Sequence, residues 1–247
     1  MADVILAVLG RPEAAHSVLN AAQCLAALIG RASIVVLAVD AVRAANPLAG
    51  EALMAEDVAA ARGRKRGRAA SLRASFDAWV SDARRADFVV IARPTPDDDA
   101  STRRAFQAAL FHTERPVLVV PDGASARFGH RVAIAWRDDS RSVKAVIPAF
   151  RVLGGAAQVD LLAGVRECAA VPSVPSVLHD HGIGASLHVL PIGPDPFGKT
   201  LLEKVHGRGA DMLVMGAYAH NPLREMIFGG VTRYMLDHAD VPVLMRH

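Results

Sequence analysis

The sequence predicts an α/β protein in which short buried strands alternate with helices. Apolar runs of strand length recur along the chain with stretches of helical length between them, which is typical of parallel sheets with right-handed crossovers. Hydrophobic residues make up 52% of the 247 residues and aromatic residues only 5%. A core built from Val, Leu, Ile and Ala suits sheets that helices bury on both faces.

Four strands are expected in the first half of the chain. An Ala- and Leu-rich helix follows the first strand and ends at Gly30, because glycine readily adopts the left-handed conformation that ends helices. The strands are predicted at residues 3–9, 34–39, 88–91 and 117–120, and the helices at residues 12–29, 51–83 and 101–111. Between residues 39 and 88, helical sequence replaces the apolar run that a further strand would need.

Five strands are expected in the second half, which begins after the turn signal at residues 121–123. The strands are predicted at residues 132–136, 159–162, 187–190, 211–215 and 241–245, and the helices at residues 142–153, 177–180, 197–207 and 231–237. Asp138, Asp139 and Ser140 precede the first of these helices, and we expect them to cap it.

Two stretches of the first half recur in the second. Residues 85–90 read RADFVV and residues 209–214 read GADMLV, while residues 115–119 read RPVLV and residues 241–245 read VPVLM. A repeat of this size indicates a duplicated domain rather than a solenoid unit. We therefore predict two domains, at residues 1–124 and 128–247.

The stretch with the strongest functional signal is residues 211–247, which read DMLVMGAYAHNPLREMIFGGVTRYMLDHADVPVLMRH. A strand ends at Gly216, and a polar loop leads to Gly229-Gly230 and a helix. This order allows backbone N–H groups at a helix N-terminus to face outward, where a phosphate can bind them and the positive end of the helix dipole.

These residues resemble the universal stress protein family. Its nucleotide-binding members carry Gly, two residues, Gly, nine residues, Gly, and then Ser or Thr. The spacing here is the same, Gly216-x2-Ala219-x9-Gly229-Gly230, with two departures. Ala219 adds a methyl group at a position where glycine permits positive φ. Gly230 lacks a phosphate-binding hydroxyl, although Thr232 follows two residues on.

The resemblance implies a Rossmann-like, flavodoxin-like open parallel sheet of strand order 3-2-1-4-5 in each half, with edge strand 3 missing from the first. It also implies that a pseudo-twofold relates the two sheets within one chain. The final strands, 117–120 and 241–245, would then meet as an intramolecular pseudo-dimer in place of the family's homodimer contact. Two such chains could still associate.

By resemblance, ATP, ADP or AMP, which can carry Mg²⁺, would bind in the second half at the switch point between its first and fourth strands. Three groups of residues would contact adenine, the ribose with its α-phosphate, and the outer phosphates. In that order they are Ala135, Trp136, Arg137, Leu162 and Ala163; Gly216, Ala219 and His220; and Gly229, Gly230, Val231 and Thr232, with Arg224 adding charge.

The first half lacks this glycine pattern. Its corresponding loop, residues 93–99, contains two prolines, which have no N–H to donate, and three aspartates, which would repel phosphate. We predict that the first half does not bind a nucleotide in the family mode.

A second phosphate signal competes with the first. Residues 193–200 match the P-loop pattern, ending in Gly198-Lys199-Thr200. However, Pro194 and Pro196 remove two N–H donors of the cradle, and Asp195 would direct an anion at the phosphates. The family also has a short Gly/Asp/Pro turn here, which favours an ordinary connection.

The remaining features point to a protein without catalysis. The Arg- and Lys-rich run from Arg62 to Arg73 has no interleaved aromatic residues, and it favours a solvated helix face over nucleic-acid binding. The net charge of +3 gives no reason to expect a nucleic-acid partner. No neighbouring carboxylate or serine in the sequence makes a catalytic set with His220, so we expect at most weak ATP hydrolysis.

Cys24 and Cys168 have no metal-ligand spacing and are expected to be reduced thiols of a cytoplasmic protein. No apolar run reaches the ~18–20 residues of a membrane span, and no basic leader precedes the first strand. Neither a metal site, a membrane nor export is expected.

Three hypotheses follow. The first is a tandem universal stress protein that binds an adenine nucleotide in its second half and regulates without turnover. The second is the same fold acting through protein–protein contacts without a ligand. The third is a P-loop-type nucleotide hydrolase that uses Gly198-Lys199-Thr200.

Overall fold

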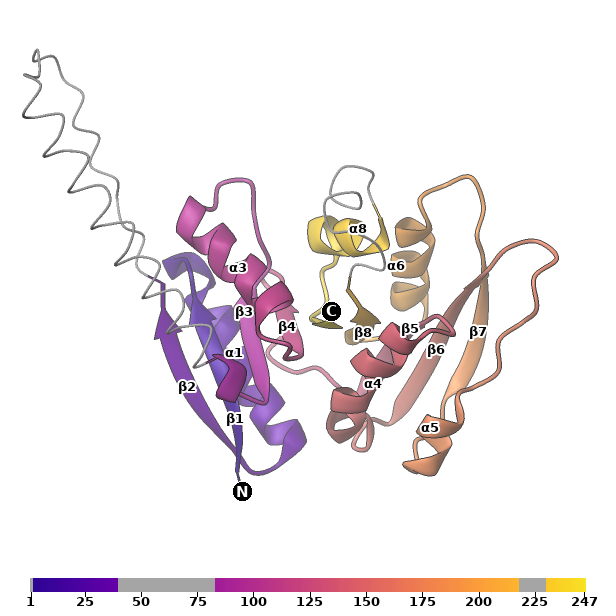
Figure 1. Cartoon of the computed structure of the whole chain (residues 1–247), viewed down its shortest axis with the longest axis horizontal. Helices are drawn as coiled ribbons and strands as arrows, with labels where there is room; N and C mark the ends of the chain where they lie inside the picture. Colours follow the sequence, from indigo (N-terminus) through magenta and orange to yellow (C-terminus); the bar gives the residue numbers. More distant parts are fainter. Residues whose placement is uncertain (1, 40–82, 218–229) are drawn as a thin grey trace, which may run out of the picture.

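Nine strands form one twisted sheet with helices on both faces, in a computed structural model that describes residues 2–39, 83–217 and 230–247 (Figure 1). The first half contributes β1 (Asp3–Leu9), α1 (Pro12–Ile29), β2 (Ala32–Ala38), β3 (Phe88–Ala92), α3 (Ala100–His112) and β4 (Val117–Val120). The second half contributes β5 (Arg131–Trp136), α4 (Ser140–Leu153), β6 (Gln158–Val165), α5 (Ser176–Asp180), β7 (Ser186–Pro191), α6 (Phe197–Gly207), β8 (Met212–Gly216), α8 (Val231–His238) and β9 (Val243–Arg246).

The predicted elements are present wherever the structure describes them, and α1, α6, β1 and β4 have the predicted bounds. The last strand begins at Val243 rather than at Val241, because Pro242 has no N–H to pair. The expected helix 51–83 and the basic run 62–73 lie outside the described residues, apart from residue 83.

The strand order is β2-β1-β3-β4-β9-β8-β5-β6-β7. Renumbered within each half, this reads 2-1-4-5 for the first half and 5-4-1-2-3 for the second, with four and five strands. The final strands of the two halves, β4 and β9, meet as expected. Their pairing joins the two expected sheets into one continuous sheet. The two strands are antiparallel, with Leu118 opposite Leu244, whereas the other strand pairs are parallel.

The sequence repeat has a structural counterpart at the start of each half. The carboxylate of Asp87 accepts a hydrogen bond from the N–H of Val4 (2.9 Å), and that of Asp211 accepts one from the N–H of Arg131 (3.2 Å). Each aspartate also donates its own N–H to the carbonyl of the same partner, at 2.7 and 2.8 Å. The repeated aspartate therefore ties the inner strands of each half together.

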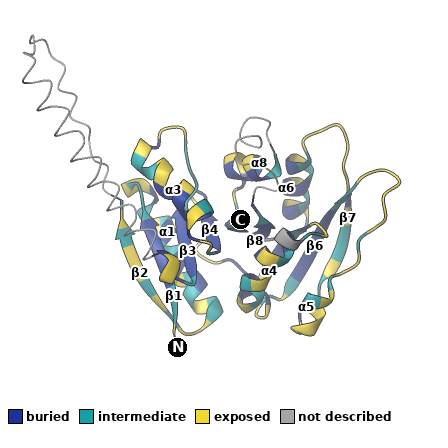
Figure 2. Ribbon diagram, viewed as in Figure 1, coloured by how far each residue is buried: buried dark blue, intermediate teal, exposed yellow. Residues whose placement is uncertain are grey.

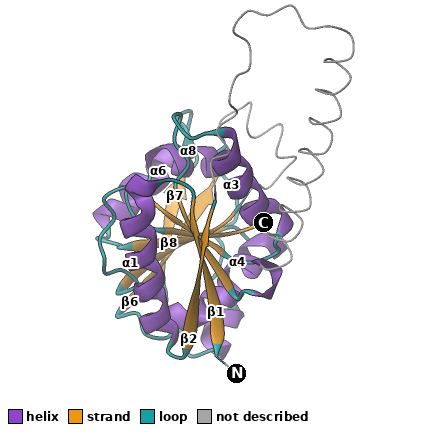
Figure 3. Cartoon of the chain, turned by 90° about the vertical axis from the view of Figure 1, so that its left-hand side faces the viewer, coloured by secondary structure: helices purple, strands orange, loops and turns teal. Residues whose placement is uncertain are grey.

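One hydrophobic layer lies on each face of the sheet and runs through both halves. Figure 2 shows that the inner strands are largely buried, and Figure 3 shows the helices packed around the sheet. On one face, Phe106 of α3 and Met235 of α8 belong to the same buried cluster, together with residues of α6. On the other face, Val18 of α1 and Val146 of α4 share a second cluster. The edge strands β2 and β7 are less buried than the inner strands.

Candidate functional site

The residues predicted to face adenine come together at the carboxyl ends of β5 and β6. Ala135 lies opposite Met215 of β8 on one side and opposite Leu162 of β6 on the other, and Trp136 lies opposite Ala163. Parallel strands that end together at a change of winding direction form the ligand crevice of open α/β sheets. The position predicted from the sequence therefore lies at the carboxyl ends of three neighbouring strands, β8, β5 and β6.

Most side chains at these strand ends are buried in the protein core. Trp136, Leu162 and Ala163 expose 5%, 1% and 1% of their surfaces, so only their backbone groups are suitable for ligand contact. Arg137 is exposed, and its Nε lies 3.8 Å from Oδ2 of Asp139. These observations agree with a site that is read mainly by backbone groups.

The helix after β5 carries its own carboxylate cap. Oδ1 of Asp139 accepts a hydrogen bond from the N–H of Ser142 at 2.9 Å, and the hydroxyl of Ser142 accepts one from the N–H of Arg137 at 3.1 Å. The capping role predicted for Asp139 is confirmed. A carboxylate therefore already caps the N-terminus of α4.

The N-terminus of α8 has a different character. Its N-cap is Gly230, whose backbone is extended (φ −67°, ψ 171°) and which has no side chain to cap the helix, and the first turn contains no acidic residue. Thr232 is buried in this turn, and Val231 packs on the same core cluster as Ala135. Gly216 ends β8, and the N–H of Ala217 binds the carbonyl of Arg246 at 2.9 Å. Ala219, His220, Arg224 and Gly229, also predicted for this site, lie outside the described residues.

The equivalent helix of the first half, α3, has Asp99 as its N-cap. Its Oδ1 accepts a hydrogen bond from the N–H of Thr102 at 2.7 Å, and this bond chiefly lowers the pKa of Asp99. A carboxylate therefore occupies the N-terminus of α3. In the second half, Gly230 takes the same place without a charge.

An arginine-centred network lies between the strand ends of the first half. The guanidinium of Arg11, after β1, donates to the hydroxyl of Thr95 (2.9 Å), to Asp98 (2.7 Å), to the carbonyl of Arg93 (3.1 Å) and to Asp122 (2.8 Å). The side chain of Asp98 is only 2% exposed. Burial disfavours the charged form of Arg11, but its hydrogen bonds to Asp98 and Asp122 outweigh burial and raise its pKa.

Sequence reasoning missed this network. The prolines and aspartates of residues 93–99 indicated a loop unsuited to phosphate, but nothing indicated that Arg11 would bind Asp98. The network also reaches the second half, because the guanidinium of Arg93 donates to the carbonyl of Ala239, at the C-cap of α8, at 2.9 Å.

The P-loop-like stretch is a connection at the edge of the sheet. It follows β7, the outermost strand, and Pro196 is the N-cap of α6. Nζ of Lys199 lies 4.0 Å from Glu203 on the exposed face of α6. A Cβ at Gly198 would lie 2.5 Å from Cβ of Tyr234, so this glycine permits α6 to pack closely on α8. The packing of the two helices explains Gly198 without a phosphate.

Within the described residues, no cluster of His, Cys, Asp and Glu side chains could hold a metal ion. No helix in that part of the chain is both long enough and apolar enough to cross a membrane.

An open, largely parallel sheet between two helical layers, with a glycine-led helix beside its inner strand ends, defines an α/β protein of the Rossmann-like class. Residues 184–247 match the model of the universal stress protein family. This match confirms the resemblance predicted from the glycine motif. No curated protein sequence matches the chain.

Solved structures with the same fold span almost the whole chain. A universal stress protein from Archaeoglobus fulgidus DSM 4304 superposes with a TM-score of 0.69 at 15% identity, covering 99% of this chain and 96% of its own. A putative universal stress protein from Pseudomonas aeruginosa UCBPP-PA14 gives 0.58 at 15% identity, covering 99% and 93%. A functionally unknown protein from Pseudomonas aeruginosa PAO1 gives 0.58 at 15% identity, covering 99% and 92%. At this identity, the likeness shows the fold alone.

Proposed function

We propose that this chain is a tandem universal stress protein whose second domain, residues 128–247, binds an adenine nucleotide and regulates without turnover. The first domain, residues 1–124, is then a degenerate copy related to the second by a pseudo-twofold. The observation that carries the proposal is the uncharged, glycine-led N-terminus of α8 next to the strand-end crevice.

The contrast among the helices of this chain supports the proposal. The corresponding helices α3 and α8 differ in their N-caps, which are Asp99 and Gly230, and α4 is capped by Asp139. A helix N-terminus concentrates about half a positive elementary charge on its outward N–H groups. In α8 no acidic side chain of the cap or first turn offsets that charge, so a nucleotide phosphate can supply the compensating anion.

The first domain supports the assignment of the nucleotide to the second domain, because carboxylates occupy its corresponding positions. Asp98 and Asp122 already bind the cation of Arg11 between its strand ends, and Asp99 caps α3. Protein carboxylates there hold positions where a nucleotide would place its own negative charge. One nucleotide per chain, bound in the second domain, is therefore expected.

Substitution of Gly230 provides a sharp test, because its backbone dihedrals suit any residue and a new N-cap does not strain α8. Gly230→Asp should abolish ATP binding in isothermal titration calorimetry, since a carboxylate would cap the helix and repel the phosphates. Gly230→Ser caps α8 without adding a charge, and should preserve or increase affinity. Serine or threonine also stands at this position in the family motif.

Lys199→Ala separates the proposal from the P-loop hypothesis, and should leave ATP binding unchanged. Loss of binding on this substitution would contradict the proposal. A wild-type protein that binds none of ATP, ADP and AMP would also contradict it, and would favour the protein-contact hypothesis.

A further inference from the structure

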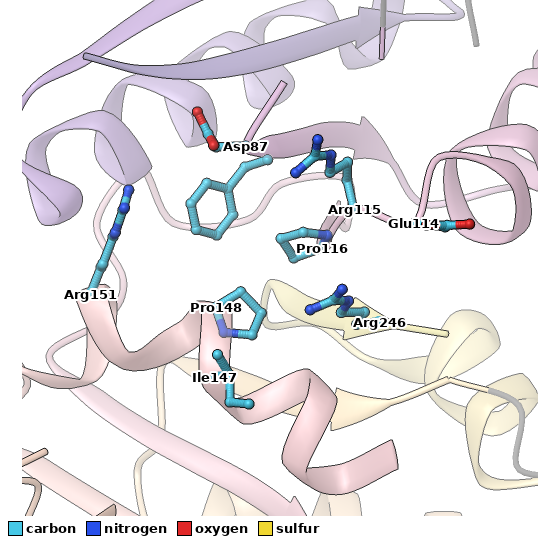
Figure 4. Close-up of a pocket in the computed structure, with 9 residues that line it drawn as sticks. Asp87, Glu114, Arg115, Pro116, Ile147, Pro148, Arg151 and Arg246 are labelled. Atoms are coloured by element: carbon cyan, nitrogen blue, oxygen red, sulfur yellow. The ribbon is translucent and has the colours of Figure 1, made fainter. Parts of the chain in front are cut away.

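A charged pocket of about 260 Å³ opens where the two halves meet (Figure 4). Its apolar part is formed by Phe88 at the start of β3, Pro116 before β4, and Ile147 and Pro148 of α4. It shares no residue with the proposed nucleotide site. Because both halves contribute to it, this pocket exists only in the joined sheet.

Two arginines that line the pocket, Arg115 and Arg246, are held by backbone carbonyls. Nε of Arg115 donates to the carbonyl of Arg84 at 2.9 Å, and Nη1 of Arg246 lies 3.4 Å from the carbonyl of Lys144. Within the described part of the chain, neither arginine forms an ion pair with an acidic side chain. Backbone carbonyls thus orient both guanidinium groups without neutralising them. Figure 4 shows the two side chains on opposite sides of Pro116.

The other charged groups of the pocket have partners or point away. The carboxylate of Asp87 accepts the N–H of Val4 at 2.9 Å, and Arg151 pairs with Asp3. The exposed side chain of Glu114 points away from the space between Arg115 and Arg246 in Figure 4. Asp87 keeps its negative charge, because a backbone N–H is neutral, whereas Asp3 balances the charge of Arg151. The groups of the pocket that can bind an anion are therefore Arg115 and Arg246.

We propose that this pocket binds a small phosphate monoester. Its phosphate would accept hydrogen bonds from Arg115 and Arg246, and a flat apolar group would pack on Ile147 and Pro148, the more exposed part of the apolar wall. Guanidinium groups present planar pairs of donors that match phosphate oxygens, and charge-assisted bonds of this kind are stronger than neutral ones. The apolar wall favours a phosphate ester over free phosphate, because burial of an apolar group adds affinity.

Phenyl phosphate is a suitable probe, because it joins a phosphate to one flat ring. Titration into the full chain should show binding that is tighter than that of inorganic phosphate, while phenol alone should not bind. Arg115→Gln and Arg246→Gln should each weaken phenyl phosphate binding about tenfold, the loss of one charge-assisted contact. Arg127→Gln, at an exposed arginine outside the pocket, should change nothing.

The two pocket variants should first be shown to unfold at the wild-type temperature, because both arginines also bind backbone carbonyls. Ile147 offers an independent test that removes no such bond, since it is 49% exposed at the pocket wall. Ile147→Glu should weaken phenyl phosphate binding by repulsion, and Ile147→Lys should strengthen it.

Absence of phenyl phosphate binding, equal affinity for inorganic phosphate, or indifference to the Ile147 charge pair would each overturn the proposal. Gly230→Asp, which tests the nucleotide site, should leave phenyl phosphate binding intact. The two proposals can therefore fail separately.

Discussion

Arg11 shows how a single residue can determine the character of a site. Asp98 is almost fully buried, and its carboxylate is matched by the Arg11 guanidinium at 2.7 Å. Asp122 binds the same guanidinium but is 53% exposed. The two carboxylates thus make similar contacts in very different surroundings, and they should differ in their contribution to stability.

Removing the buried ion pair between Arg11 and Asp98 should lower the stability of the protein. Arg11→Ala leaves the Asp98 carboxylate buried without its cation, and we expect it to lower the free energy of unfolding by about 3 kcal/mol. Asp122→Asn breaks an exposed pair and should cost less than about 1 kcal/mol. Urea unfolding of the two variants measures this difference, and equal losses would show that burial of Asp98 does not govern the network.

Among the elements at the β7 edge of the sheet, a second buried carboxylate connects two strands and a helix. Asp160 of β6 is 1% exposed and binds Gln158 (2.6 Å), His188 of β7 (2.7 Å) and Arg208, the C-cap of α6 (3.1 Å). Burial raises the pKa of Asp160, but the hydrogen bonds from Arg208, His188 and Gln158 together lower it below its ordinary value. Asp160 therefore links three neighbouring elements in its ionised form.

The stability supplied by Asp160 should depend on pH. Since its folded pKa is depressed, its contribution is complete above the ordinary carboxyl value near 4 and disappears as pH falls through the folded pKa. Asp160→Asn should cost about 2 kcal/mol at pH 7, and the gap to the wild type should narrow below about pH 4. Thermal unfolding of both proteins across this range measures the gap, and a gap that stays constant would contradict the prediction.

The elements that could be predicted are those whose signals are local. Helix α1 begins at Pro12 and ends before Gly30, and both residues mark helix ends in any sequence. The Arg11 network could not be predicted, because Arg11, Asp98 and Asp122 are far apart in sequence and each is ordinary by itself. The pocket arginines could not be predicted for the same reason, since Arg115 and Arg246 come to line one pocket only because β4 pairs with β9. The glycine spacing was a local signal for one part of the predicted nucleotide site. A spacing pattern does not predict which side chains of the site are buried.

The whole molecule is organised around the β4–β9 pair. Leu118 and Leu244 lie opposite each other and are 0% and 1% exposed. The layers on the two faces continue across this pair, from α1 to α4 on one side and from α3 to α8 on the other. Neither half can therefore separate without exposing core residues of the other. A chain built in this way should unfold as one cooperative unit.

Truncation at the junction tests this expectation. Leu118→Ala and Leu244→Ala should each lower the free energy of unfolding by about 2–5 kcal/mol, as expected when a buried leucine leaves a cavity. Because the core is shared, either variant should lower amide-exchange protection in β1 and β6 alike, although these strands lie in different halves. Ile147→Ala, at a half-exposed position of α4, is a control that should cost much less. If Leu118→Ala released β1 and left β6 fully protected, the halves would be independent domains that only touch at β4 and β9.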